Sequence, residues 1–247
     1  GQVFEQGVGI KACLEALRPA WDRECMAVEA FNSANTTHKR GVGIASGWYG
    51  CGNTSLPNPS TIKSGVRPDG TVVLHQGAMD IGQGANTVIT QIFAEALGLP
   101  VQQITIIGPD TDVTPDAGKT SASRQTYVSG SAARLSGESL RAAILKQVNA
   151  SGDASGDAKF EFINGTLRVI DGASEHWINL SSLSCDDEGY VFQAQETYDP
   201  PTKPLDENGQ GIPYAQFGYT AQLVVVEVDT ALGTVTPVKF VAAHDVG

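Results

Sequence analysis

The chain has 247 residues, of which 41% are hydrophobic and 17% charged, and this length suffices for a sizeable core in one large or two smaller domains. The formal net charge of −11 argues against nucleic-acid binding, which needs clustered Lys and Arg. No apolar run reaches the roughly 20 residues of a membrane-spanning helix, and no signal peptide is visible. The four scattered cysteines form no CxxC pair, which argues against a zinc or iron–sulfur site and favours free thiols in a reducing, cytoplasmic compartment.

The first forty residues predict a helix, because their apolar residues recur at three- and four-residue spacing. Pro19 is expected to break or restart this helix. The periodicity ends in residues 32–37, so we expect a helical segment over residues 1–38 and a larger domain over residues 39–247 that is incomplete at its C-terminal end. The apolar stripe of the helix comprises Val8, Ile10, Leu14, Leu17, Trp21, Cys25, Val28 and Phe31.

The next hundred residues alternate between strands and helices. The small, apolar run over residues 41–52 predicts a buried strand that other backbone approaches closely. A turn at Pro68, Asp69 and Gly70 joins the segments STIKSGVRP and TVVLHQG in a hairpin. An amphipathic helix is expected over residues 85–97, then a short strand in QQITIIG, and then a long helix over residues 123–148.

The C-terminal hundred residues predict strands only. Residues 151–158 are expected to be flexible and exposed, and Asn164 with Gly165 forms the turn of a hairpin. Three further β segments follow: YVFQAQETY, GYTAQLVVVEVDT and TVTPVKFVAAHDVG, the last two joined over residues 229–233. The whole predicts an α+β fold in which helices pack on antiparallel or mixed sheets.

Common site patterns fail in this sequence. Gly118, Lys119 and Thr120 resemble the end of a P-loop, but Val113 stands where that loop needs its first glycine. The acidic stretch before them lacks the glycine of a calcium loop, because Pro115 occupies that position. The four histidines have no metal-ligand spacing, and no nucleophile elbow is present. We therefore predict no metal ligand and no hydrolase site.

Residues 79–84, MDIGQG, lie between a predicted strand and a predicted helix. Gly82 and Gly84 permit backbone dihedrals closed to other residues and let a ligand approach the backbone. The free N–H groups at the start of the helix favour an anion, and the amide of Gln83 can both donate and accept. The pattern is equally compatible with a tight strand–helix turn.

Residues 118–125, GKTSASRQ, repeat this chemistry before the second long helix. Thr120, Ser121 and Ser123 offer hydroxyls, and Arg124 carries a planar guanidinium suited to bidentate contact with phosphate. The alternative is that one serine caps the helix. A cap needs only one such residue, whereas five of the six residues 120–125 are polar.

Four segments, in this order, resemble the molybdenum-binding part of the xanthine dehydrogenase and aldehyde oxidoreductase family. The resemblance covers most of the chain from Lys39 onward and is weakest over residues 149–190. The run WYGCGNTSLPNPSTIK is also similar to the medium molybdopterin subunit of bacterial nicotinate dehydrogenases. The four segments are GVGIASGWYGCG, PDGTVVLHQGAMDIGQGANTVITQIFAEALGLP, TPDAGKTSASRQTYVSGSAAR and GYTAQLVVVEVDTALGTVTPVKFVAAHDVG.

The resemblance implies a molybdopterin-binding subunit of an enzyme that hydroxylates an aromatic N-heterocycle or an aldehyde, with water as the oxygen source. It implies molybdenum held by molybdopterin in its cytosine dinucleotide form, with iron–sulfur clusters and FAD on partner chains or domains. By motif position, Gly82, Gln83 and Gly84 would contact the pterin. The phosphate or dinucleotide end would be held by Thr120, Ser121, Ala122, Ser123, Arg124 and Gln125.

The sequence departs from the family in lacking its GVGE-like segment, which carries the catalytic glutamate, and its FGGK-like pterin segment. We therefore expect no catalytic base in this chain and no activity without partners: another molybdopterin-binding chain or C-terminal domain, an iron–sulfur subunit and a flavin subunit. Asp80 and Glu95 are poor substitutes for the base, since Asp80 lies in the cofactor turn and Glu95 on a helix flank. The alternative hypothesis is a structural or interaction domain that kept the fold and lost the cofactor.

Overall fold

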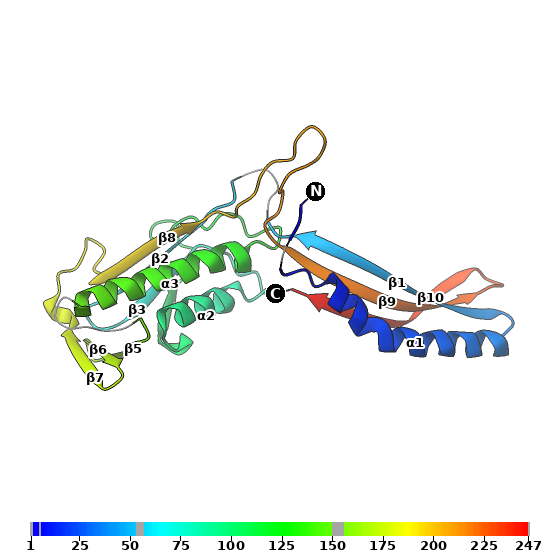
Figure 1. Ribbon diagram of the computed structural model, residues 1–247, viewed down its shortest axis with the longest axis horizontal. Coiled ribbons are helices and arrows are strands. Elements are labelled where there is room, and N and C mark those ends of the chain that lie inside the picture. The colour runs from blue at the N-terminus through cyan, green and yellow to red at the C-terminus, as the bar shows by residue number, and fades with distance from the viewer. Residues whose placement is uncertain (1, 5, 53–56, 150–155, 247) are drawn as a thin grey trace. The chain divides into compact units, whose positions relative to one another are not determined.

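The structure is a computed structural model that describes residues 2–4, 6–52, 57–149 and 156–246. The chain forms two compact units, one of residues 1–51 and 202–247 and the other of residues 52–201. Helices and three sheets make up these units (Figure 1), which confirms the predicted α+β class. None of the described helices is long and apolar enough to cross a membrane.

The first unit consists of one helix on a three-stranded antiparallel sheet. Helix α1 (Ile10–Ala34) packs on strands β1 (His38–Gly50), β9 (Phe217–Asp229) and β10 (Thr234–Asp245), which lie in the order β1-β9-β10. This compact unit therefore contains residues from both ends of the sequence. Helix α1 and strand β1 belong to the same unit, with no boundary between them at residue 38. The reason is that the apolar face of α1 finds its core only on the sheet.

Helix α1 runs through Pro19 without interruption, so the predicted break is wrong. Pro19 is exposed, while Leu17 and Ala20 on either side of it are buried against the sheet, and this packing holds the helix together. The buried stripe is also rotated relative to the prediction, since Cys13 is buried and Leu14 is 40% exposed.

Strand β1 was predicted to be buried, and this is wrong. None of its residues is buried, because β1 is an edge strand that pairs only with β9. Small apolar side chains occur both in buried central strands and in exposed edge strands. The sequence alone does not distinguish these two positions in a sheet.

The second unit has helices α2 (Ala85–Leu97) and α3 (Gln125–Asn149) on a four-stranded sheet of order β4-β3-β2-β8. Strands β2 (Ser60–Val66) and β3 (Val72–Gln76) form the predicted hairpin. Strand β4 (Ile104–Ile107), preceded by the 3-10 turn Val101–Gln103, runs parallel to β3, and β8 (Phe192–Tyr198) runs antiparallel to β2. Both helices and these strands were predicted, with α3 starting slightly later than expected.

A third, three-stranded sheet belongs to the same unit. Strands β5 (Lys159–Ile163) and β6 (Thr166–Asp171) form the predicted hairpin, and its turn residues Asn164 and Gly165 both have positive φ. Strand β7 (Ser174–Asn179), followed by the 3-10 turn Leu180–Ser182, was not predicted, because its residues are mostly polar and exposed. Most of the segment predicted to be flexible and exposed, residues 151–158, lies outside the described residues, and within its described part Ala158 is buried rather than exposed.

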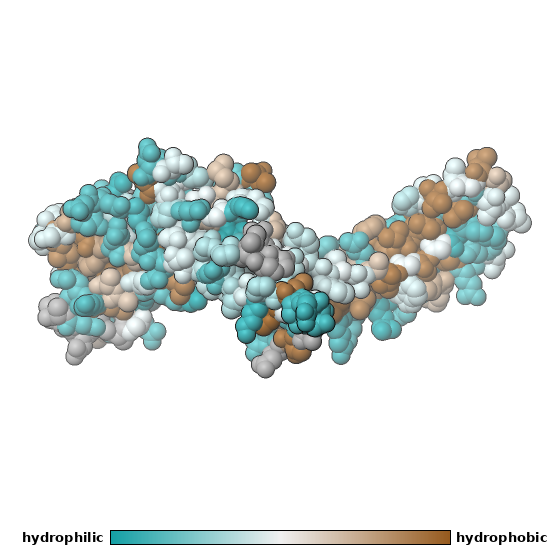
Figure 2. All heavy atoms as spheres, turned by 90° about the horizontal axis from the view of Figure 1, so that it is seen from above, coloured by the Kyte–Doolittle hydropathy of each residue, from teal (hydrophilic) through white to brown (hydrophobic). Residues whose placement is uncertain are grey.

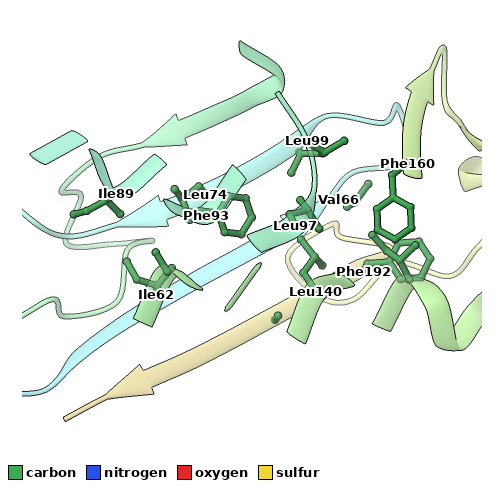
Figure 3. Close-up of a cluster of buried hydrophobic side chains, with 14 of the residues drawn as sticks. Ile62, Val66, Leu74, Ile89, Phe93, Leu97, Leu99, Leu140, Phe160 and Phe192 are labelled. Carbon is green, nitrogen blue, oxygen red and sulfur yellow. The ribbon is translucent and has the colours of Figure 1, made fainter. Parts of the chain in front are cut away.

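One hydrophobic core joins both helices of this unit to its sheets (Figure 3). Burial of each large apolar side chain stabilises the fold by about 1.5–3 kcal/mol. The core therefore holds in place the end of β3 and the starts of α2 and α3. The core includes Ile62, Val66, Leu74, Ile89, Phe93, Leu97, Leu99, Leu140, Phe160 and Phe192.

Helices α2 and α3 approach each other closely at Gly137. A Cβ atom at this position would lie 2.9 Å from the Cβ of Ala96 and 2.9 Å from the carbonyl oxygen of Phe93. The absence of a side chain at Gly137 therefore sets the distance between the two helices, and with it the position of the chain segments that precede them.

Candidate functional site

The two predicted cofactor segments lie next to each other in the second unit. Residues 79–84 connect β3 to α2, and residues 118–125 lead into α3. The backbone N–H of Met79 donates to Oγ1 of Thr120 over 3.0 Å. Gly77 packs so tightly that a Cβ there would lie 2.7 Å from the carbonyl oxygen of Pro115. The structure thus brings together two segments that are about 40 residues apart in the sequence.

A third segment, at Gly52, supports the second one. The N–H of Gly52 donates to the carbonyl oxygen of Ala122 over 2.8 Å. Gly52 has φ of +103°, and a Cβ there would lie 2.6 Å from Nδ2 of Asn58, so only glycine fits. Gly52 therefore lies against the backbone of residues 118–125 within the second unit.

The first segment is organised by the carboxylate of Asp80. One oxygen of Asp80 accepts from the N–H groups of Gly82 (2.9 Å) and Gly84 (3.3 Å), and the other accepts from the N–H of Asn86 (3.0 Å). These hydrogen bonds hold the pKa of Asp80 below its usual value, the bond from Asn86 contributing most. Asp80 is thus an ionised cap at the start of α2, a role that the sequence analysis missed. A carboxyl with a lowered pKa is also a poor general base.

Replacing Asp80 with asparagine is expected to lower stability in a pH-dependent way. Because the folded-state pKa is lowered, the carboxylate stabilises the fold above its ordinary pKa of about 3.9, and this contribution is lost as the pH falls through the folded-state pKa. Urea midpoints of wild type and Asp80→Asn should therefore differ at about pH 7, and the difference should shrink as the pH falls below the ordinary pKa of about 3.9. Glu95→Gln, an exposed change on the same helix, should match the wild type at both values. A gap for Asp80→Asn that does not change with pH would contradict the charged cap.

Gln83 folds back onto its own segment. Its Oε1 accepts from the N–H of Ile81 (2.6 Å), and its Nε2 donates to the carbonyl oxygen of Met79 (3.0 Å). Gly82 and Gly84 have φ of +103° and +82°, and a Cβ at either would meet open space. These two glycines therefore serve backbone conformation, and the space above them is open to a ligand.

The second segment contains two consecutive non-glycine residues with left-handed backbone. Ala122 and Ser123 have φ of 53° and 55°, which explains why α3 begins at Gln125 rather than at residue 123. Left-handed alanine is uncommon and costs free energy, so the surrounding hydrogen bonds must impose it. The hydroxyls of Ser121 and Ser123 belong to exposed residues, whereas Thr120 is half-buried.

Arg124 is buried beneath the second segment, with only 1% of its surface exposed. Its Nη1 donates to the carbonyl oxygens of Ala117 and Lys119, and its Nη2 donates to those of Asn58 and Pro59. Burial lowers the pKa of the guanidinium, and the charges of two nearby aspartates oppose that change. The guanidinium thus clamps two chain segments together.

This geometry corrects the predicted role of Arg124. Both of its Nη groups are used by backbone carbonyls, so the bidentate phosphate contact expected from the sequence is not available; only Nε lacks an acceptor within the described residues. A Cβ at Gly118, which has φ of +68°, would lie 2.8 Å from Nη1, so the guanidinium fills the space below that glycine. Arg124 positions the segment and does not present a charge on its surface.

Gln125 is also buried and used internally. Its Nε2 donates to the carbonyl oxygen of Lys119 (3.0 Å) and to Oγ1 of Thr120 (3.1 Å), and its Oε1 accepts from the hydroxyl of Ser129. Because Thr120 also accepts from Met79, this chain of hydrogen bonds links α3 to both segments. Contact of Gln125 with a cofactor stays a prediction.

Lys119 is the cation that the sequence analysis missed. It is exposed, lies between Gly118 and Thr120, and makes no ion pair with any described residue. The incomplete P-loop pattern included this lysine. That its segment lies next to residues 79–84 became apparent only in the structure. An exposed ammonium is a suitable point charge for a phosphate.

The donor chemistry of the site fits a cofactor with a phosphate and a hydrogen-bonding ring system. Open space lies above Gly82 and Gly84, and two serine hydroxyls and one lysine face solvent, whereas the N–H of Asn86 at the start of α2 is already taken by Asp80. Within the described residues no group of three or more His, Cys, Asp or Glu is placed to hold a metal ion. The arrangement can bind and orient a polar, anionic ligand.

Comparison with known proteins points in the same direction. The sequence model described as "Molybdopterin cofactor-binding domain" matches residues 15–247. A putative xanthine dehydrogenase molybdenum-binding subunit of Escherichia coli is 31% identical over 97% of this chain and 31% of the relative. An aldehyde oxidoreductase of Megalodesulfovibrio gigas is 27% identical over 95% of this chain and 23% of the relative. The chain thus spans about a third or less of the length of these relatives.

Solved structures share the fold. The aldehyde oxidoreductase from Desulfovibrio desulfuricans superposes with a TM-score of 0.72 and 25% identity, over 96% of this chain and 23% of that one. Quinoline 2-oxidoreductase from Pseudomonas putida superposes with a TM-score of 0.66 over 99% of this chain and 31% of that one, and its 19% identity supports the fold alone.

Proposed function

Because this chain belongs to the family of molybdopterin cofactor-binding domains, we propose that it is the cofactor-binding part of a molybdenum hydroxylase and that residues 79–84 and 118–125 contact the cofactor. The observation that carries this proposal is the hydrogen bond between Met79 and Thr120, which makes one surface out of two segments rich in ligand donors. A turn and a helix cap with separate structural roles would not need to meet.

The residues of the surface have distinct tasks in this proposal. Gly82 and Gly84 let the pterin approach the backbone, and the hydroxyls of Ser121 and Ser123 with the ammonium of Lys119 bind its phosphate end. Arg124 and Gln125 hold these groups in position from below. Pre-positioned groups bind more tightly because less conformational entropy is lost on binding.

The bound cofactor would supply the redox chemistry, the hydroxylation of an aldehyde or an aromatic N-heterocycle with water as the oxygen source. The cytosine dinucleotide form, the iron–sulfur and flavin partners, the second molybdopterin-binding part and the cytoplasmic location belong to the same proposal. No residue of this chain is assigned as the base, since Asp80 is a helix cap and Glu95 is exposed on α2.

Molybdenum and pterin analysis of the purified, intact complex tests this function. We expect both in stoichiometric amounts, and a metal-free complex with full activity would contradict the proposal. That result would favour the alternative, a structural domain that has kept the fold and lost the cofactor.

Lys119→Met is expected to weaken cofactor retention. A hydrogen bond to a charged group contributes about 1.5–3 kcal/mol, which corresponds to a loss of affinity of about tenfold or more. The measurement is the pterin content of the complex after extended dialysis. Lys146→Met, which removes an exposed lysine from the last turn of α3, is the matched control and should leave the content unchanged. Equal retention in both variants would remove Lys119 from the site.

A further inference from the structure

The sheet of the first unit has one covered face and one open face. Alternate residues of β9, among them Leu223 and Val225, are buried beneath α1, whereas Val224 and Val226 between them remain partly exposed on the opposite face. Helices of soluble proteins normally cover an apolar sheet face, and here no described element of the unit does so. The open face is therefore an apolar surface that no described element of its own unit covers.

The residues of this open face follow from the strand register. Gly43 of β1, Val224 of β9 and Phe240 of β10 form one row across the sheet, and Ala45 pairs with Gln222 in the next row. Phe240 is 59% exposed. Hydrophobic residues run along the length of this unit in the surface view (Figure 2). Contiguous exposed apolar surface of this kind marks an interaction site.

A groove runs along this face beside β1. It has a volume of about 470 Å³ and arises because Gly41 and Gly43 have no side chains, while Val224 and Val226 rise next to them. A flat sheet would offer only area, but a groove of this kind can receive large apolar side chains and fix the register of a partner. The groove is lined by Gly41, Val42, Gly43, Ile44, Ala45, Gln222, Val224 and Val226.

We propose that this face docks against an apolar surface of the remaining part of the molybdenum-binding subunit, with aliphatic or aromatic side chains seated in the groove. This inference rests on the proposed function. Its support is the length of the relatives: the chain covers 31% of the E. coli molybdenum-binding subunit, so about two-thirds of that relative has no counterpart here and must pack somewhere.

A second copy of the chain fits the face less well. The formal net charge is −11, so two copies repel each other over long range, and the residues that line the groove carry no charge that would offset this repulsion.

Cysteine labelling of the intact complex tests the docking. Ala45→Cys places a thiol on the open face, and Ala27→Cys places one on the exposed side of α1 as the matched control. Each complex is treated with N-ethylmaleimide, and the modified peptides are quantified by mass spectrometry before and after denaturation. We expect position 27 to be modified in the native complex and position 45 to be protected until denaturation. Equal modification of both in the native complex would overturn the proposal.

Photo-cross-linking identifies the occupant. Replacing Phe240 with the photoreactive p-benzoylphenylalanine should yield cross-links to peptides of the remaining part of the molybdenum-binding subunit. Cross-links to a second copy of this chain would overturn the proposed partner. Molybdenum is measured in the same preparations: a loaded complex with a reactive position 45 overturns the docking alone, and a complex without molybdenum overturns the proposed function on which it rests.

Discussion

Replacing Arg124 with methionine is expected to lower the free energy of unfolding by about 3–5 kcal/mol. The guanidinium donates to four backbone carbonyls from two segments, and those of Ala117 and Asn58 lie in buried residues, so their oxygens would lose a partner where water has little access. The measurement is the urea midpoint at constant m-value. Because the clamp supports residues 118–125, the variant should also lose cofactor from the intact complex.

Two further variants show whether the geometry of the clamp is the cause. Arg134→Met makes the same change at an exposed i,i+4 ion pair with Glu138, and its cost should stay below about 0.5 kcal/mol. Arg124→Lys keeps the charge, but one ammonium cannot reproduce the planar fork, so an intermediate loss is expected. If Arg124→Met unfolds at the same urea concentration as Arg134→Met, the clamp does not stabilise the site.

Gly137→Ala is expected to lower the free energy of unfolding by about 1–3 kcal/mol, although alanine favours helices. The new Cβ would meet the Cβ of Ala96 and the backbone of Phe93 at 2.9 Å, and backbone cannot move without shifting α2. Thermal unfolding of the purified protein gives the change. Since α2 and α3 follow the two cofactor segments, a shift between them should also reduce cofactor retention.

Gly130→Ala is the matched control on the same helix. Its Cβ would meet only the terminal Cδ1 of Ile92, at 2.7 Å, and that flexible side chain can rotate away. The helix preference of alanine should then leave stability unchanged or raise it by up to about 1 kcal/mol. If both glycine variants behave alike, the helix contact at Gly137 does not set the position of α2.

The roles within the candidate site differ from those that the residue types indicated. The most conspicuous residues, Arg124 and Gln125, face inward and connect backbone segments, while the groups left for a ligand are less conspicuous: glycine backbone, two serines and Lys119. The phosphate-binding surface proposed here therefore does not include the nearest arginine. In this protein the arginine organises the loop, and the lysine offers the charge.

Local patterns in the sequence determined most elements of the fold. The turns at Gly70 and at Asn164 with Gly165, and the helix from Ala85 to its end at Gly98, were readable because backbone conformation and side-chain periodicity are local properties. The adjacency of the two cofactor segments was expected only through the family resemblance. No local property of residues 79–84 indicates which later loop they will meet.

Tertiary structure alone decided burial and partners. Packing on the sheet carried α1 through Pro19, and the strand order left β1 at an open edge. Two of the carbonyls around Arg124 come from Asn58 and Pro59, more than 60 residues before it in the sequence. Long-range contacts of this kind depend on the summed packing of many residues, so composition and spacing do not reveal them. The sequence by itself therefore determined which segments could hold a cofactor, and the tertiary structure decided which side chains in them remain free to do so.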